Sequence, residues 1–510
     1  MSIISIILIC ILICLVCYAV YQRFCYFANR SIPYPPIPSI FLGHLPILWS
    51  VISHAEQLRQ WTRQYGSVYG LFEGIRPMYV TSDVAFIEEI FVKQFHRFPI
   101  RRLTLVNRSI GHKLSNVFSA GLLSVWRRQR RILTPTFTGA KMRRLLPTVD
   151  TCVNLFMDKL NTVPSGSIFN IYELYKRLTM DVICRCAFGI DTDVQNDMEN
   201  QNIYMKKVAE MFAKNAELTL LARMHRVTSH TVFGDICVLL FKLKRLITVN
   251  DSQLQANVWL LEHMNEFVQQ RFDKTQTLEP TSDLLQLMMN AVHSDKDVLT
   301  PTELLSNVFV VLAAGFETTS TALAYCTYCL ALYQDIQEKL YQELVEHWRP
   351  DETNTYDIIS SKLTFMDLFV REVLRMYPPV PQVVQRQCTE NTHVAGHDIQ
   401  KGTLIQIDVL SVHYDQELWG PEPVNEFHPE RHLQKRHPVA FLPFGAGPRT
   451  CIGMRFALME VKLCLAQLIS TYRILPSSFE DYKLNITEQI SMTPDNVYIK
   501  VEKRITSSSQ

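Results

Sequence analysis

The distribution of hydrophobic residues divides the chain into an apolar N-terminal segment and a long mixed body. Residues Ile3 to Tyr21 form an almost unbroken apolar run of about nineteen residues that carries no charged side chain. At about 1.5 Å per residue, a helix of this length crosses the hydrocarbon core of a bilayer, which is about 30 Å thick. The run therefore predicts a transmembrane helix within residues 1–22.

A proline-rich segment follows this run. Residues 33–38 read Pro-Tyr-Pro-Pro-Ile-Pro, and prolines at this density give a stiff, extended spacer, so we expect a hinge over residues 23–39. Arg23 and Arg30 lie on the C-terminal side of the apolar run, and the positive-inside rule then keeps the body in the cytosol. A cleaved signal peptide is the alternative, but the run is too long and no small-residue cleavage site follows it. We expect a signal anchor in the endoplasmic reticulum membrane.

A second apolar pattern, at helical spacing, begins near residue 300. Thr300-Pro301-Thr302-Glu303 has the form of a capping box with proline at the first helical position, and the pattern then runs to about Tyr333. Glu317 interrupts its apolar half, which indicates a core helix of a large body. Thr318 can bond back to the carbonyl of Ala314, loosen the helix and open a groove beside Gly315.

Composition narrows the class of protein. The chain has 510 residues, 47% of them hydrophobic, and no linker after the first forty, which favours one compact body over residues 40–505. A net charge of +2 gives no reason to expect nucleic acid as a partner. The thirteen cysteines lie mostly among apolar neighbours, and the pair Cys326 and Cys329 falls within the helical pattern. We interpret that pair as core packing and not as a redox or zinc motif.

One cysteine stands apart from the others. Residues 444–453 read Phe-Gly-Ala-Gly-Pro-Arg-Thr-Cys-Ile-Gly and lead into an apolar helical stretch from Phe456 to Ile469. The glycines let the backbone turn tightly and lie against a flat ligand, and a helix start favours a thiolate at Cys451. From residue chemistry alone Cys451 is a metal-ligating cysteine; a glycine-rich turn with an inert cysteine is the alternative.

The whole segment resembles the haem-binding loop of the cytochrome P450 family, Phe-x-x-Gly-x-Arg-x-Cys-x-Gly. Its fixed positions are met by Phe444, Gly447, Arg449, Cys451 and Gly453. The resemblance implies a mostly α fold with small β-sheets (α+β), preceded here by the transmembrane helix. It implies haem b, with Cys451 as the axial ligand of the iron and Arg449 paired with a propionate; the thiolate ligand is a known property of that family.

Other segments carry the same resemblance in the same order along the chain. Residues 314–319 are similar to the oxygen-binding helix of the family, which implies that Thr318 hydrogen-bonds dioxygen and that Glu317 relays protons. Protons must reach a site that otherwise excludes water, and these two residue types suit that task. Residues 372–375 match Glu-x-x-Arg, and with Arg431 they imply a buried network that positions the haem loop; its members are Glu372, Arg375 and Arg431.

Further arginines complete the expected haem site. Trp126 and Arg130 match Trp-x-x-x-Arg, which implies contact with a propionate, and Arg386 resembles a further propionate arginine. The basic residues around them form a solvated face that could steer an acidic reductase. These basic residues are Arg127, Arg128, Arg131, Lys141, Arg143 and Arg144.

The resemblance extends over nearly the whole chain after residue 30 and is nearest to the animal microsomal clan of the drug- and steroid-metabolising 3A enzymes. It implies a monooxygenase that inserts one oxygen atom from O2 into a lipophilic steroid, fatty acid or xenobiotic. NADPH-cytochrome P450 reductase would supply the electrons, with cytochrome b5 as an optional second donor, because the chain has no dinucleotide motif of its own. A haem-thiolate isomerase and a haem sensor are the rival functions.

The substrate is expected to contact four segments that are apolar on average: residues 103–120, 196–241, 308–314 and 380–384. By analogy with the family, residues 196–241 also make a second membrane contact, and ordinary core helices are the alternative.

Overall fold

A computed structural model describes most of the chain. The described residues are 3–102, 104–105, 108, 115–197, 201–212, 219–229, 232–247, 252–274, 283–292, 298–348, 355–478 and 482–504. Parts of the predicted substrate segments, at positions 103, 106–107, 109–114, 198–200, 213–218 and 230–231, lie outside these residues.

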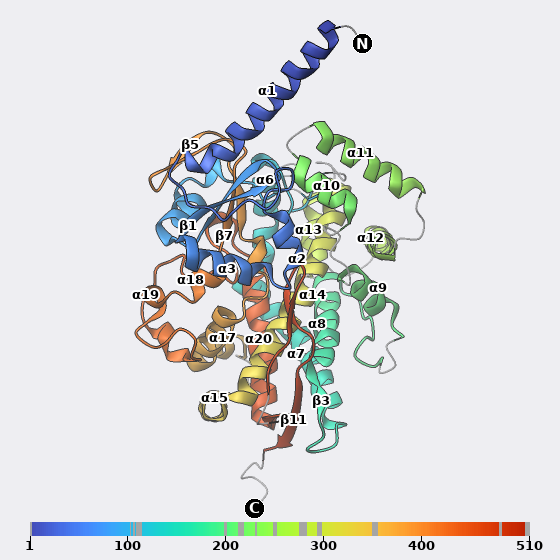
Figure 1. Cartoon of the computed structure of the whole chain (residues 1–510). Coiled ribbons are helices and arrows are strands. Elements are labelled where there is room, and N and C mark those ends of the chain that lie inside the picture. Colours follow the sequence, from blue (N-terminus) through green and yellow to red (C-terminus); the bar gives the residue numbers. More distant parts are fainter. Residues whose placement is uncertain are drawn as a thin grey trace, which may run out of the picture.

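Helices make up most of the body, with small sheets toward one side and one end (Figure 1). The prediction of a mostly α fold with small β-sheets is confirmed. The longer helices are α1 (Ile3–Ala28), α3 (His54–Tyr65), α6 (Leu123–Leu133), α7 (Gly139–Asn161), α8 (Ile171–Phe188), α9 (Ile203–Phe212), α10 (Leu220–Thr228), α11 (Val232–Ile247), α12 (Ser252–Lys274), α13 (Leu284–Val292), α14 (Pro301–Leu332), α15 (Gln334–His347), α17 (Thr364–Met376) and α20 (Met454–Thr471).

Helix α14 is the central element of the core. Its predicted capping box is present, because the Thr300 side chain accepts from the Glu303 N–H and the Glu303 carboxylate accepts from the Thr300 N–H. It packs against α8, α12 and α20, and Cys326 and Cys329 are buried in that contact. Within the described part of the chain, α14 is long and apolar enough to cross a membrane, but more than half of its apolar window lies inside the body. It is a core helix, as predicted.

Among the described residues, the strands form one mixed sheet, one antiparallel sheet and two hairpins. The largest sheet has the order β1-β2-β7-β4, in which β2 and β7 run parallel. A second sheet has the order β3-β11-β8, and β5–β6 and β9–β10 are hairpins. The bounds are β1 Val68–Glu73, β2 Arg76–Thr81, β3 Phe169–Asn170, β4 Gln385–Gln387, β5 Thr392–Val394, β6 His397–Ile399, β7 Leu404–Ile407, β8 Tyr472–Pro476, β9 Ile486–Glu488, β10 Met492–Pro494 and β11 Tyr498–Lys503.

Helix α1 projects from the body, and its last turn packs on the largest sheet (Figure 1). The helix runs past residue 22 to Ala28, and the chain then has no helix until Leu45. Phe27 is fully buried and meets Phe72 and Tyr79 edge to ring. Aromatic contacts of this kind explain why the helix continues into residues for which the prolines predicted a hinge.

A buried ion-pair network joins α17 to the segment that precedes the cysteine loop. The Glu372 carboxylate accepts from Arg375 at 2.8 and 2.9 Å and from Arg431 at 2.8 Å, and all three side chains are buried. His432, for which the sequence suggested no role, is a fourth member, with its Nε2 3.0 Å from Glu372. These contacts outweigh the cost of burial and lower the pKa of Glu372 from 4.5 to about 2.

His413 extends this network to the cysteine loop. The Arg375 guanidinium donates to the His413 carbonyl at 2.7 Å, and the His413 Nδ1 lies 2.8 Å from the Arg375 carbonyl. The other ring nitrogen accepts from the Leu442 N–H at 3.0 Å, two residues before Phe444. Burial lowers the pKa of His413 to about 3, so the ring is neutral and can accept this bond. The network therefore fixes the chain that enters the loop.

Replacing Glu372 with Gln should destabilise the protein by roughly 3–5 kcal/mol, because it leaves buried arginines without their carboxylate. The pKa of Glu372 is lower in the folded protein, so its contribution is complete above about pH 4.5 and is lost as the pH falls toward 2. Thermal unfolding between pH 6 and pH 3 measures both effects, and E372Q should show the shallower pH dependence. Arg371→Gln, which removes an exposed pair on the same helix, is the matched control and should change little. Equal losses in the two variants would contradict the network.

Candidate active site

The cysteine loop is closed by its own backbone. The Cys451 N–H donates to the Phe444 carbonyl at 2.9 Å, and the Thr450 hydroxyl donates to the same carbonyl at 3.2 Å. A short 3-10 turn, Gly447–Arg449, lies between them, and α20 begins three residues after Cys451. The backbone N–H groups of Gly453 and Met454 therefore hydrogen-bond the sulfur. This is the helix-start geometry that the sequence predicted.

The Cys451 side chain is exposed, but desolvation of the sulfur by the surrounding protein raises the pKa of the thiol. The Gly453 and Met454 N–H groups, Arg130 and Arg101 oppose this rise. The helix start alone therefore does not lower the pKa of this cysteine. A metal ion on the sulfur would supply the missing positive charge, because a coordinated thiol is deprotonated by the ion.

Two of the loop glycines occupy backbone conformations that favour glycine. Gly445 and Gly447 have φ of +68° and +67°, whereas Gly453 has an ordinary φ of −85° and caps α20. A Cβ on Gly447 would come 1.9 Å from the Phe91 carbonyl oxygen, whereas a Cβ on Gly445 would meet no atom within 4 Å. Gly447 is thus required by close packing against Phe91, and Gly445 lies at an open surface.

Four arginines lie around the cysteine loop. Arg130 and Arg101 are near enough to affect the pKa of Cys451, and Arg449 and Arg386 adjoin Arg101. Arg449, Arg386 and Arg130 were predicted there, and Arg101 is a fourth that no motif indicated. Arg449 and Arg386 are buried, and the Nε atoms of Arg101, Arg386 and Arg449 are buried without a hydrogen-bond partner. Within the described residues, none of these three forms an ion pair with a carboxylate.

Mutual repulsion adds to the cost of burying these arginines. Burial, then Arg101 and Arg130, lower the pKa of Arg449 to about 8, and burial, then Arg101 and Arg449, lower that of Arg386. Buried guanidinium groups without counter-charges require an anionic partner. The two propionates of haem b would meet this requirement, so the residues present fit the predicted cofactor.

Trp126 forms one wall of this arginine group. Its ring is buried against Phe95, and the Arg449 guanidinium carbon lies 4.8 Å from its centre. Arg386 lies similarly over Phe91, at 4.1 Å. Both arginines lie over aromatic faces. Arg449 also donates to the Phe118 and Ala120 carbonyls and Arg386 to the Gln385 carbonyl, so neutral backbone groups are their hydrogen-bond partners and their Nε atoms have none.

Most of the basic face that the sequence predicted is solvated. Arg127, Arg131, Arg143 and Arg144 are exposed, and Arg143 pairs at the surface with Asp357 at 2.6 Å. Arg128 differs, because it is half-buried and forms an ion pair with Glu303 at 2.5 Å at the start of α14.

Thr318 lies near the middle of α14 and makes its predicted bond, donating to the Ala314 carbonyl at 2.6 Å. Ala314 is exposed although α14 is a core helix, so this part of the helix faces open space. Gly315 itself faces α8, where a Cβ would lie 2.8 Å from Ile183, so a groove beside Gly315 can lie only on the side of Ala314.

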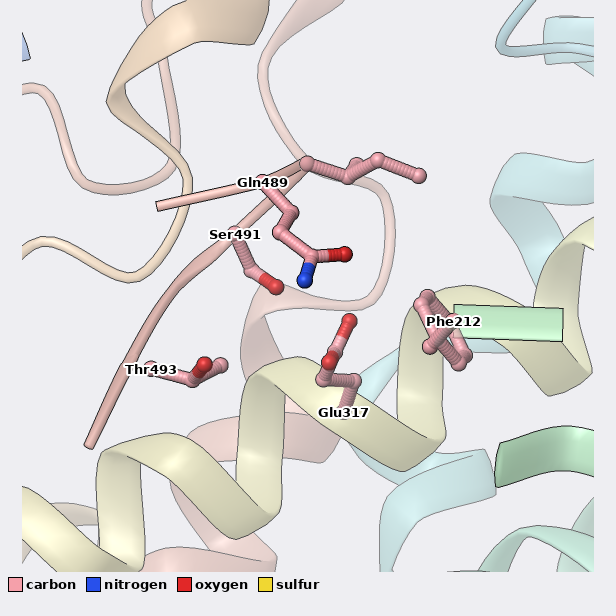
Figure 2. Close-up of a pocket in the computed structure, with 6 residues that line it drawn as sticks. Phe212, Glu317, Gln489, Ser491 and Thr493 are labelled. Atoms are coloured by element: carbon pink, nitrogen blue, oxygen red, sulfur yellow. The ribbon is translucent and has the colours of Figure 1, made fainter. Parts of the chain in front are cut away.

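Glu317 points into a pocket between α14 and the β9–β10 hairpin (Figure 2). Burial raises the pKa of its carboxyl, and a hydrogen bond from Ser491 and the charge of Lys176 oppose this rise. Successive helix positions differ by about 100° in direction, so Glu317 and Thr318 face different sides of α14. Ser491, like Arg101, lies in no motif that the sequence reveals.

Gly447→Ala should lose bound haem as well as stability, because its Cβ cannot be accommodated without moving Phe91 or the loop. Gly445→Ala is the matched control: its φ is the same, but it should cost only the strain of about 1–2 kcal/mol. Haem content per protein and thermal unfolding measure the difference. Similar behaviour of the two variants would show that backbone conformation, and not contact with Phe91, requires the glycine.

The chain was also compared with known proteins. The family model of cytochrome P450 matches residues 33–501. Cytochrome P450 CYP13A4 of Caenorhabditis elegans is 32% identical over 480 residues, covering 88% of this chain and 89% of the relative. Cytochrome P450 3A29 of Sus scrofa is 28% identical over 491 residues, covering 94% and 92%. Cytochrome P450 3A31 of Mesocricetus auratus is 27% identical over 505 residues, covering 95% and 93%.

The resemblance that the sequence motifs carried is thereby confirmed, including its relation to the 3A enzymes. Members of this family hold haem b through a cysteine thiolate and act as monooxygenases. The cysteine loop, the unpaired arginines beside it and the match over nearly the whole chain lead to one conclusion: this chain belongs to the cytochrome P450 family.

Proposed function

We propose that this chain inserts one oxygen atom from O2 into a lipophilic small molecule, using electrons from an NADPH-dependent reductase. Cys451 would be the axial ligand of haem b. The observation that carries the proposal is the group of buried arginines that lack carboxylate partners beside that cysteine. Haem, when bound, supplies the binding and activation of O2.

The haem is held by residues from four parts of the chain. Arg449 belongs to the loop itself, Arg386 to β4, and Trp126 and Arg130 to α6. Arg101 precedes the segment that leads to α6 and adds a fourth guanidinium. Bidentate arginines suit carboxylates, so these groups would bind the propionates. Phe444, Gly447 and Gly453 shape the cysteine loop.

Thr318 and Glu317 handle protons. The Thr318 hydroxyl donates to the Ala314 carbonyl, which leaves its oxygen lone pairs free to accept a hydrogen bond on the open side of the helix. The raised pKa of Glu317 brings that carboxyl closer to neutral pH, where an acid can both release and regain a proton. Because the two side chains face different sides of α14, Glu317 is the member of the pair nearer to solvent and Thr318 is the member nearer to the reaction centre.

The substrate is a steroid, fatty acid or xenobiotic of low polarity. Around exposed Ala314, α14 carries half-buried apolar side chains at positions 309–311 and 313, and the segment 380–384 is also mostly apolar. Such a lining favours a substrate that gains from leaving water. NADPH-cytochrome P450 reductase is the proposed electron donor, with cytochrome b5 as a second donor. Exposed Arg127 and Arg144, on α6 and α7, favour an acidic partner.

We propose that residues 1–22 anchor the protein in the endoplasmic reticulum membrane. Residues 23–39 connect this anchor to the body, and the body, residues 40–505, lies in the cytosol. Helix α1 is apolar over most of its length, and α11 lies at the same end of the molecule (Figure 1). Helix α11 exposes a row of large apolar side chains, which supports a second contact with lipid. Its exposed apolar residues are Val232, Phe233, Ile236, Leu239, Leu240 and Leu243.

A carbon monoxide difference spectrum of the reduced protein tests the reaction centre. The wild type should give the thiolate-type absorption, and Cys451→Ala should lose it. Thr318→Ala should keep the absorption but release more peroxide for each NADPH oxidised, because it lacks the hydroxyl that passes protons inward. Turnover that needs no reductase would favour a peroxide-rearranging enzyme. Unchanged peroxide release in T318A would remove Thr318 from the proton path.

A variant that lacks residues 1–22 should remain partly bound to membranes. Combining this deletion with Phe233→Asp and Leu239→Asp should release the remainder. Each Asp would bring a charge into the lipid contact, which is costly. Fractionation in carbonate buffer measures the release. Val345→Asp, at an exposed apolar residue of α15, is the matched control and should have no effect. Full release by the deletion alone would contradict a contact through α11.

A further inference from the structure

The pocket beside Glu317 has a volume of about 100 Å³. A cavity needs roughly 10–15 Å³ by this measure to hold one water molecule, so this pocket can hold several. It lies between α14, the end of α9 and the β9–β10 hairpin (Figure 2). Its lining residues are Phe212, Glu317, Gln489, Ile490, Ser491 and Thr493.

The lining runs from solvent to the Glu317 carboxyl. Gln489 and Ile490 are exposed at the tip of the hairpin, whereas Ser491 is buried and hydrogen-bonds Glu317. Figure 2 shows the Glu317 carboxyl turned toward the side chains of Gln489 and Ser491. Polar groups thus line a continuous path inward, and Phe212 closes one side as an apolar wall.

The hairpin holds Ser491 in a fixed position. The next residue, Met492, donates its N–H to the Pro379 carbonyl at 2.7 Å and accepts at its own carbonyl from the Tyr325 hydroxyl of α14 at 2.9 Å. On the other strand, the Glu488 carboxylate accepts from the Ser53 hydroxyl at 2.6 Å and from the Ala55 N–H at 2.9 Å. Both strands are tied to the body, so the Ser491 hydroxyl is preorganised toward Glu317.

Helix α8 supplies the charged and titratable groups on the opposite side. Lys176 lies close enough to favour the ionised form of Glu317, and Tyr172 is affected by the Glu317 charge. Lys176 also forms an ion pair with Glu173 at 2.8 Å, so its positive charge is shared between Glu173 and Glu317. Ser491 is therefore the hydrogen-bond donor on the pocket side, where water can enter.

We propose that this pocket is the route by which water and protons reach Glu317, and that Ser491 is the positioning residue that holds the carboxyl at its inner end. The proposal rests on the proposed function of Glu317 as a proton carrier. The mixed polar lining and the exposed mouth favour water as the occupant. When O2 takes up two electrons and two protons it leaves as peroxide, and with four electrons and four protons it leaves as two waters. Slower proton supply therefore favours peroxide.

The test is Ser491→Ala in the haem-loaded, full-length protein. The Ser491 hydroxyl stabilises the carboxylate by donating to it, so its removal should raise the pKa of Glu317. Infrared titration of the carboxyl band, with Glu317→Gln to assign it, measures the shift. During substrate-free NADPH oxidation with an added reductase, the ratio of peroxide to water should rise about fivefold, which corresponds to one hydrogen bond of about 1 kcal/mol.

Two matched variants separate this role from a loss of structure. Ser491→Thr keeps the hydroxyl and should keep both the titration and the product ratio. Thr487→Ala removes an exposed hydroxyl of the same hairpin, which faces Asp495, and should change neither. An S491A protein with an unshifted Glu317 titration, or a T487A protein that behaves like S491A, would overturn the proposal.

Glu317→Gln distinguishes this inference from the function on which it rests. If E317Q raises the peroxide ratio and S491A does not, Glu317 carries protons but the pocket is not their route, and the inference alone fails. If E317Q leaves the ratio unchanged, the proposed role of Glu317 fails as well. A solvent deuterium isotope effect that increases in S491A but not in T487A would support the route.

Discussion

Buried positive charge beside a single cysteine is the constraint on which this site depends. Arg449 and Arg386 are held out of water by aromatic rings, with Arg101 and Arg130 near enough to repel them. A folded protein keeps such a group only if a ligand neutralises it, because desolvated guanidinium groups are costly. The exposed Cys451 thiol has a pKa raised by desolvation, so it lacks a partner that stabilises its thiolate form. A single bound group that carries a metal cation and carboxylates would satisfy both.

The network around Glu372 explains how the loop remains in place despite this repulsion. One carboxylate receives two arginines and a histidine, and the backbone carbonyls of residues 413 to 426 accept the remaining N–H groups of those arginines. The His413 ring then accepts a hydrogen bond from the Leu442 N–H, which holds the chain just before the cysteine loop. The loop is thus attached to α17 at one end and to α20 at the other.

Sequence predicted the features that depend on neighbouring residues. The Thr300 cap, the bond from Thr318 to Ala314 and the turn before α20 each involve residues at most a few positions apart, so their spacing is visible in the chain. The fold was predictable for another reason, because its motifs lie in a fixed order that only one family shares. Arg101 and Ser491 were missed because Cys451 and Glu317, the groups whose pKa they affect, lie more than one hundred residues away. The close packing of Gly315 was not visible for the same reason, because its neighbour, Ile183, belongs to another helix.

The last turn of α1 has a mechanical consequence. Phe27 lies directly on Gly70, where a Cβ would come 2.5 Å from its ring, and Arg23 is bonded to the Ile75 carbonyl at 3.0 Å. The helix and the largest sheet are therefore joined as one stiff unit at this junction. A surface that binds the outer part of α1 therefore also fixes the tilt of the body relative to that surface. The orientation of the body relative to such a surface is then determined by how Phe27 packs on Gly70.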